Sequence, residues 1–183
     1  MSSLLDYAAK RCLTAAGMLI YQKQVLLIKH KKLGAWLCPG GHVDRDELPH
    51  QAAEREFAEE TGLQVVAFDP YYQYQGKDSE YYPSPIETNL HWVCLENYRR
   101  RIKSPDNYRP VKTWAKGCEQ HLGLVYLLKP AHQELLKLNP NRSEVDEIGW
   151  FSLKEVDRLE ASPDIKQQIK HGFAIMAALK TSR

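Results

Sequence analysis

The most informative segment of the chain is residues 41–63, which read GHVDRDELPHQAAEREFAEETGL. Its second half consists mainly of helix-forming residues. Pro49 is typical of the first turn of a helix, and Gly62 is typical of the position just after the last turn. We therefore expect a helix over residues 49–61. The segment contains seven acidic residues and two arginines, although the whole chain of 183 residues has a net charge of +2.

Three glutamates share one face of this expected helix. At about 100° per residue, Glu56, Glu59 and Glu60 fall within an arc of roughly 100°. Like charges at spacings of three and four destabilise a helix, and carboxylates in the last turn face the negative end of the helix dipole. Folding alone does not favour this arrangement, but a bound divalent cation would reverse both penalties. Because oxygen ligands select hard cations, the pattern predicts a Mg²⁺ or Mn²⁺ site; the alternative is an acidic face exposed to water.

The rest of the chain predicts strands and two further helices. Helices are expected over residues 153–159 and 165–180, and the second has an apolar stripe that indicates either core packing or a dimer face. The order of strands, helix, strands and helices favours an α+β fold. The expected strands are residues 13–21, 24–29, 64–68, 89–95, 122–128 and 148–151, with a break at Pro39-Gly40-Gly41, and the stripe is Ile165, Ile169, Phe173 and Met176.

Length and composition exclude several classes of protein. The chain fits one domain, and its small net charge excludes a uniformly basic nucleic-acid binder. No apolar run approaches the roughly 20 residues of a membrane span, and the first residues contain no apolar signal segment. No cysteines are spaced as CxxC, so a zinc knuckle is not expected. We expect a cytoplasmic protein in which all four thiols are reduced, namely Cys12, Cys38, Cys94 and Cys118.

Residues 41–63 resemble the Nudix box, G-x5-E-x7-R-E-U-x-E-E-x-G-U, in which U is a bulky apolar residue. A chance match anywhere in the chain is on the order of one in ten million. Residues 36–41 and 144–151 also resemble the family, so the resemblance extends over most of the chain. The positions that meet the motif are Gly41, Glu47, Arg55, Glu56, Phe57, Glu59, Glu60, Gly62 and Leu63.

The resemblance implies a single Nudix domain over residues 1–183, built as an α/β/α sandwich with a mixed sheet and additional C-terminal helices. It also implies metal-dependent hydrolysis of a diphosphate bond in a nucleoside diphosphate linked to another group. The implied metal ligands are the Gly40 carbonyl and the carboxylates of Glu56, Glu59 and Glu60. The implied catalytic residues are Glu56 as general base, Arg55, which orients Glu56, and Glu60, with Glu47 supporting the site or binding a further metal.

The resemblance further implies one more carboxylate from a loop near the last strand. Glu144 is the first candidate and Glu147 the second, and the alternative is an acidic loop without a chemical role. Other hydrolytic chemistries lack their motifs, since the chain has no G-x-S-x-G, Walker P-loop or H-E-x-x-H sequence. The remaining functional alternative is a Nudix-fold module that senses a nucleotide without cleaving it, but the intact motif favours an enzyme.

Two regions are candidates for substrate binding. Tyr81 and Tyr82 end a segment that holds five of the ten tyrosines; they could stack on a base or simply lie at the surface. A long basic loop over residues 98–117 could hold a polyphosphate or an RNA 5′ end, or could be a solvated insertion. Its aromatic residues include Trp114, and its densest positive charge is Arg99, Arg100 and Arg101.

The sequence favours a small nucleoside diphosphate derivative over RNA as the substrate, with no membrane partner. A homodimer is the alternative role of the C-terminal stripe. His91 and His121 lie in expected strands, and we interpret them as structural rather than catalytic residues.

Overall fold

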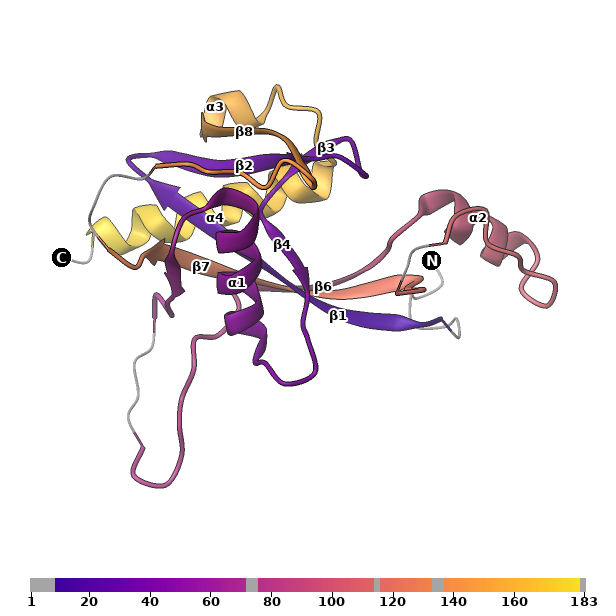
Figure 1. The fold of residues 1–183 in the computed structure, drawn as a ribbon, viewed down its shortest axis with the longest axis horizontal. Coiled ribbons are helices and arrows are strands. Elements are labelled where there is room, and N and C mark those ends of the chain that lie inside the picture. Colours follow the sequence, from indigo (N-terminus) through magenta and orange to yellow (C-terminus); the bar gives the residue numbers. More distant parts are fainter. Residues whose placement is uncertain (1–8, 72–75, 114–115, 133–136, 182–183) are drawn as a thin grey trace.

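The computed structural model describes residues 9–71, 76–113, 116–132 and 137–181. Trp114 therefore lies outside the described residues. Among those described, no helix combines the length and apolar character needed to cross a lipid bilayer. The elements, in chain order, are β1 (Arg11–Tyr21), β2 (Gln24–His30), β3 (Ala35–Leu37), β4 (Gly40–His42), α1 (Pro49–Thr61), β5 (Val65–Ala67), β6 (Glu87–Trp92), α2 (Leu95–Lys103), β7 (Gln120–Pro130), β8 (Val145–Ser152), α3 (Leu153–Val156) and α4 (Pro163–Thr181) (Figure 1).

The described strands form one mixed sheet of eight strands. Its centre is the parallel pair β1 and β7, whose register runs from Arg11 opposite Gln120 to Leu19 opposite Leu128. The other pairings are antiparallel: β2 with β1, β3 and β8, β4 with β1, and β5 and β6 with β7. The expected α+β fold with a mixed sheet is confirmed.

Side chains of the two central strands alternate between two hydrophobic cores, one on each face of the sheet. Leu19 and Leu128 pack on the α1 side around Phe57, which is fully buried. Met18 and Leu127 pack on the opposite side, where α4 lies across the sheet (Figure 1). Burial of each such side chain stabilises the fold by about 1.5–3 kcal/mol.

The apolar stripe of α4 packs against this second core. Ile169 is fully buried, and the remaining stripe residues are partly buried against the same cluster. The core interpretation of the stripe is therefore confirmed for these residues. The partly buried members are Ile165, Phe173 and Met176.

Helix α1 begins and ends where the sequence predicts. Pro49 is its first residue, and the Leu48 N–H donates to Gln51 Oε1 at 2.9 Å, which satisfies a donor that the helix leaves unpaired. Gly62 ends the helix with φ of 78°, a left-handed conformation that favours glycine. Its N–H donates to the Ala58 carbonyl at 2.8 Å.

Two parts of the chain differ from expectation. The predicted break contains a strand, β4, that pairs with β1. A Cβ on Gly40 would lie 2.6 Å from Ala16 Cα, so glycine lets these two backbones approach closely.

The long connection expected over residues 98–117 begins inside a helix, α2, rather than as a loop. The buried Asn97 side chain holds the returning chain against this helix. Its Oδ1 accepts the Val111 N–H at 2.8 Å, and its Nδ2 donates to the Lys112 carbonyl at 2.7 Å. Contacts across 14 and 15 residues therefore support α2.

A disulfide joins Cys12 to Cys118, across a sequence separation of 106 residues. Parallel pairing of β1 and β7 places Cys12 opposite His121, three residues after Cys118, and so brings the two sulfurs together. The expectation of four reduced thiols is therefore wrong for this pair. Cys38 and Cys94 are free.

Candidate active site

The acidic face of α1 lies against the two glycines that begin β4. The Gly40 N–H donates to Glu60 Oε2 at 2.9 Å. A Cβ on Gly41 would lie 2.3 Å from Glu56 Oε1, so only glycine leaves room for that carboxylate. The glycine pair thus lets the backbone of β4 touch both glutamates.

Arg55 joins the carboxylates of this site. Its Nε and Nη2 donate to the two oxygens of Glu47 at 3.0 and 2.7 Å, a two-pronged contact that is strong and directional. Its Nη1 donates to Glu56 Oε1 at 2.9 Å and lies 3.4 Å from Glu59 Oε2. Nη2 also donates to the His42 carbonyl at 3.0 Å, a contact without a sequence signal because any residue offers that oxygen. Arg55 therefore contacts the carboxylate of Glu56 directly, and its role in orienting Glu56 during catalysis stays a prediction.

Burial and like charge dominate the electrostatics of the site. The pKa of Glu60 is raised to about 8, mainly by burial; the nearby carboxylates also raise it, whereas the Gly40 N–H lowers it. Burial also raises the pKa of Glu56, although Arg55 opposes that shift. The hydrogen bond from Arg55 lowers the pKa of Glu47. The buried carboxylates therefore lie where additional positive charge would stabilise their ionised forms.

Glu144 belongs to the same acidic cluster, and Glu147 does not. The charge of Glu144 raises the pKa of both Glu56 and Glu60. Its carbonyl accepts the Lys31 N–H at 2.9 Å, which fixes the backbone just before β8. Glu147 instead forms an ion pair with Lys29 at 2.9 Å. Glu144 is therefore the one of the two that lies near the acidic face of α1, and its role as a metal ligand or base stays a prediction.

The donor atoms of the cluster fit a hard divalent cation. They are all oxygens, and Glu60 is 2% exposed. Among the described residues, the ion pairs to Glu56 and Glu59 come from Arg55. In the described part of the chain, no three of these carboxylates bring their oxygens within 4.8 Å of one another. Side-chain rotation would therefore have to close the ligand set around an ion.

The tyrosines proposed for base stacking lie near the other end of α1. Tyr82 stacks on His50, with ring centroids 4.9 Å apart and an interplanar angle of 24°. Tyr81 is 54% exposed. Glu56 follows His50 by six residues, which is roughly 9 Å along the helix axis. A substrate that touched both Tyr82 and Glu56 would have to lie along the helix.

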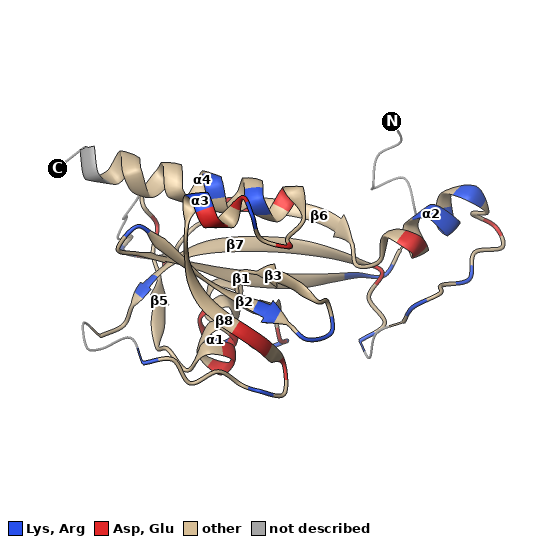
Figure 2. Ribbon diagram, turned by 90° about the horizontal axis from the view of Figure 1, so that it is seen from above, with Lys and Arg blue, Asp and Glu red and all other residues tan. Residues whose placement is uncertain are grey.

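The arginine cluster of α2 is not brought to the acidic face of α1. Figures 1 and 2 show α2 at one end of the molecule, and in Figure 2 its Lys and Arg positions are well separated along the ribbon from the Asp and Glu positions of α1. Arg100 pairs with Glu96, and Arg101 lies over the Tyr108 ring at 4.4 Å. A cavity of about 300 Å³ also lies in this part of the molecule, away from α1. Its lining includes Arg101, Tyr108, Lys112 and Cys118.

Comparisons with known proteins agree with the motif. The family model of the NUDIX domain matches residues 13–172. A Bacillus subtilis (strain 168) protein named putative 8-oxo-dGTP diphosphatase is 50% identical over 44 residues, which are 24% of this chain and 30% of that protein. An RNA pyrophosphohydrolase of Erythrobacter litoralis (strain HTCC2594) is 36% identical over 76 residues, 36% of this chain and 46% of that protein. The chain thus spans less than half the length of these curated relatives.

A solved structure supports the fold. The crystal structure of a NUDIX-family hydrolase from Clostridium perfringens superposes with a TM-score of 0.64, covering 91% of this chain and 99% of that one. Its sequence identity is 21%, so the similarity concerns the fold alone.

Proposed function

The chain belongs to the NUDIX family, and from this membership we propose that it is a hydrolase that cleaves a diphosphate bond in a nucleoside diphosphate derivative with the help of Mg²⁺ or Mn²⁺. The observation that carries the proposal is the acidic face of α1. There the buried Glu60 accepts a hydrogen bond from the Gly40 N–H, and Arg55 holds Glu56. The names of the two curated relatives support it, because each describes a phosphohydrolase that acts on a nucleotide or on RNA.

The proposed ligand set for the cation is the Gly40 carbonyl with the carboxylates of Glu56, Glu59, Glu60 and Glu144. When bound there, a divalent cation would neutralise charge on the phosphoryl oxygens and lower the pKa of a coordinated water. Oxygen-only ligands of this kind suit Mg²⁺ and Mn²⁺ rather than a softer metal.

The side chains themselves supply orientation and proton transfer. Glu56 is the proposed general base, because the Arg55 contact at 2.9 Å fixes its carboxylate and favours its ionised form. Glu47 holds Arg55 in turn, through both of its oxygens. The Glu47–Arg55–Glu56 chain would therefore keep the base pointed into the site during turnover.

The proposed substrate class is a small nucleotide derivative. Tyr82, stacked on His50 at the start of α1, is the candidate contact for a base, with Tyr81 beside it in sequence. Because α2 is separated from α1, we do not expect Arg99, Arg100 and Arg101 to bind the diphosphate that is cleaved. These three residues fit better as a distant contact for a longer substrate.

An activity panel tests the proposal. The purified chain is incubated with Mg²⁺ or Mn²⁺ and nucleoside triphosphates, oxidised nucleoside triphosphates, dinucleoside polyphosphates, nucleotide sugars, ADP-ribose and capped RNA, and products are separated by chromatography. We expect at least one nucleotide substrate to be cleaved at a diphosphate bond, and we expect the cleavage to disappear in chelator. Glu60→Gln is the matched loss-of-function variant, and Glu96→Gln on α2 is the control.

The outcome also separates an enzyme from a sensor. Nucleotide binding measured by calorimetry without cleavage of any substrate, with either metal, would contradict the proposal. That result would favour a binding module built on the same fold.

A further inference from the structure

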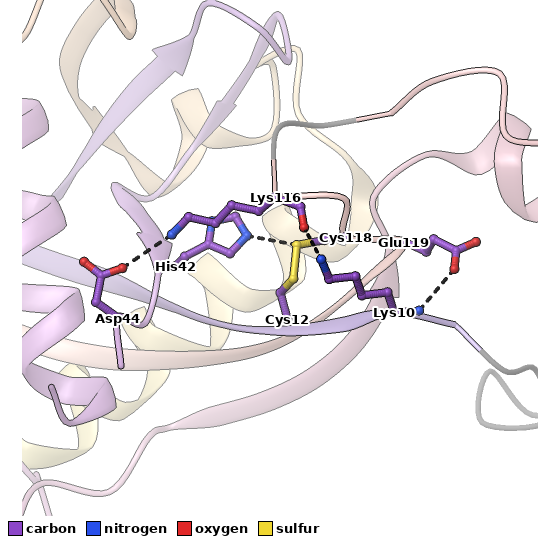
Figure 3. The surroundings of a disulfide bond; sticks show 7 residues. All are labelled: Lys10, Cys12, His42, Asp44, Lys116, Cys118 and Glu119. Atoms are coloured by element: carbon purple, nitrogen blue, oxygen red, sulfur yellow. Dashed lines mark hydrogen bonds and ion pairs between the residues drawn. A yellow bond between two sulfur atoms is a disulfide. The ribbon is translucent and has the colours of Figure 1, made fainter. Parts of the chain in front are cut away.

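A cluster of sulfur and imidazole side chains lies at one end of the central strand pair. The ligand atoms of Cys12, His42 and Cys118 all lie within 4.8 Å of one another. His42 Nε2 is 3.3 Å from Cys118 Sγ, and Figure 3 shows the imidazole pointing at the sulfur pair. No other group of three metal-ligating side chains in the described part of the chain is this compact.

Strand register explains why these residues meet. Cys12 lies opposite His121 in the parallel pair β1–β7, and Thr14 lies opposite His42 in the antiparallel pair β1–β4. Partners in register share a face of the sheet, as do residues two apart along a strand. Gly41 faces Glu56, so His42 points to the opposite side of β4. The cluster is therefore separate from the acidic site.

Further imidazoles adjoin the cluster. The His121 ring lies 5.1 Å from the His42 ring, and His91 lies 5.5 Å from His121 on its other side. Cys118 and His121 also form a C-x2-H sequence, a short spacing between two metal-ligating residue types.

The distances suit a tetrahedral ion. With Zn–S of about 2.3 Å and Zn–N of about 2.0 Å, a sulfur and a nitrogen ligand of one zinc lie roughly 3.5 Å apart. The 3.3 Å between His42 Nε2 and Cys118 Sγ is close to that value. The Cα atoms of Cys12 and Cys118 are 5.8 Å apart, so rotation of the cysteine side chains could separate the sulfurs without a large backbone movement.

We propose that the dithiol form of this cluster is a zinc site, with Cys12, Cys118 and His42 as ligands and His121 as the fourth. Two electrons from a thiol or phosphine reductant convert the disulfide into two thiols, with the two protons supplied by the reducing thiols, or by the water that oxidises the phosphine to its oxide. Each thiol releases its proton when it binds Zn²⁺. Thiolate and imidazole ligands select zinc rather than Mg²⁺. Lys10 and Lys116 flank the pair in Figure 3, and their positive charges favour thiolates.

The first test titrates metal into the full chain after reduction and removal of metal with a chelator. Excess Mg²⁺ is present throughout, so that the acidic face of α1 is occupied by its own ion. We expect one equivalent of Zn²⁺ to bind. Co²⁺ in its place should give the intense visible bands of a tetrahedral ion and a thiolate-to-cobalt absorption band. The oxidised chain should give neither spectrum.

Variants locate the site. Cys12→Ser, Cys118→Ser and His42→Ala should each weaken zinc binding by at least about 10²-fold, a loss at or above that seen when groups supporting metal ligands are removed. His121→Ala should lose the tetrahedral cobalt spectrum. Cys94→Ser and His91→Ala are the matched controls, since both lie outside the proposed ligand set, and they should bind zinc as the parent does.

A second measurement does not depend on the variants folding. In the reduced parent, Zn²⁺ should protect Cys12 and Cys118 from alkylation, as mapped by mass spectrometry, and should leave Cys94 reactive. Parent-like zinc affinity in Cys12→Ser, absence of the thiolate–cobalt band, or equal alkylation of Cys12 and Cys118 with and without zinc would overturn the proposal. An unchanged cobalt spectrum in His121→Ala would overturn the four-ligand site.

Discussion

Strand β4 separates two clusters of opposite ligand chemistry. On the α1 side, Gly41 faces Glu56 and all the donors are oxygens, most of them from one helix. On the other side, His42 contacts Cys118 and the donors are sulfur and nitrogen from three separate parts of the chain. If both proposals hold, one short strand lies between two ions of different softness, because alternate residues of a strand face opposite sides.

The largest expected effect concerns the carboxylates on the α1 side of β4. Glu60→Gln or Glu59→Gln should lower kcat by at least about 10²-fold, the scale lost when a group that stabilises charge in the transition state is removed. Turnover at saturating Mg²⁺ measures the change, and Cys94→Ser serves as a control outside both clusters. Near-normal turnover in both glutamine variants would remove these carboxylates from the catalytic site.

Gly41→Ala tests how closely β4 must approach α1. The new Cβ would lie 2.3 Å from Glu56 Oε1, so the carboxylate would have to leave the position in which Arg55 holds it. We expect a fall in kcat of roughly 10- to 100-fold and a loss of about 1–3 kcal/mol in the free energy of unfolding, the usual cost of overpacking. Denaturant unfolding and steady-state kinetics measure the two effects. Parent-like kcat would show that the site tolerates movement of Glu56.

Glu144→Gln and Glu147→Gln test which of these two residues belongs to the acidic cluster beside α1. Only Glu144 is near enough to affect the pKa of Glu56 and Glu60, whereas Glu147 is paired with Lys29. Glu144→Gln should lower kcat roughly tenfold with little change in KM, as expected when an interaction made mainly in the transition state is lost. Glu147→Gln should resemble the parent. The reverse pattern would assign the fourth carboxylate to Glu147.

The raised pKa of Glu60 predicts how the stability of the metal-free protein changes with pH. Its folded pKa of about 8 lies above the ordinary value of 4.5, so the folded state binds this proton more tightly than the unfolded state. The resulting stability is complete below pH 4.5 and is lost as the pH rises toward 8. At pH 8 in chelator, the free energy of unfolding of Glu60→Gln should therefore exceed that of the parent by about 2 kcal/mol. At pH 5 this difference should be smaller. If Glu60→Gln and the parent were equally stable at both pH 5 and pH 8, ionisation of Glu60 would not destabilise the folded state.

The smallest expected effect concerns α2. Changing Arg99, Arg100 and Arg101 together to Ala should raise KM only about two- to threefold for a small nucleotide, and this effect should shrink at high salt because exposed charges are screened. KM measured at low and high ionic strength tests this expectation. A tenfold or larger rise at low salt would show that α2 reaches the substrate despite its distance from α1 in Figure 1.

Local sequence was sufficient wherever a feature depends on residues close together in the chain. The ends of α1 follow from Pro49 and Gly62, and the shared face of its glutamates follows from helical periodicity. The apolar stripe of α4 predicted its packing for the same reason. Helix α2 and strand β4 were missed because their support comes from distant residues: Val111 and Lys112 bond to Asn97 of α2, and β1 pairs with β4.

The sequence by itself determined the acidic helix, its motif and the family, because spacing along one helix fixes which side chains are neighbours. Only the tertiary structure joined Cys12 to Cys118 and placed His42 beside them, since strands 106 residues apart in sequence become neighbours through sheet pairing. The same holds for the contact from Arg55 to the His42 carbonyl and for the position of Glu144 near Glu60. The physical reason is that packing of the whole chain sets the register of the strands and the places to which the loops bring the chain back. Helical spacing, in contrast, is set by the backbone alone.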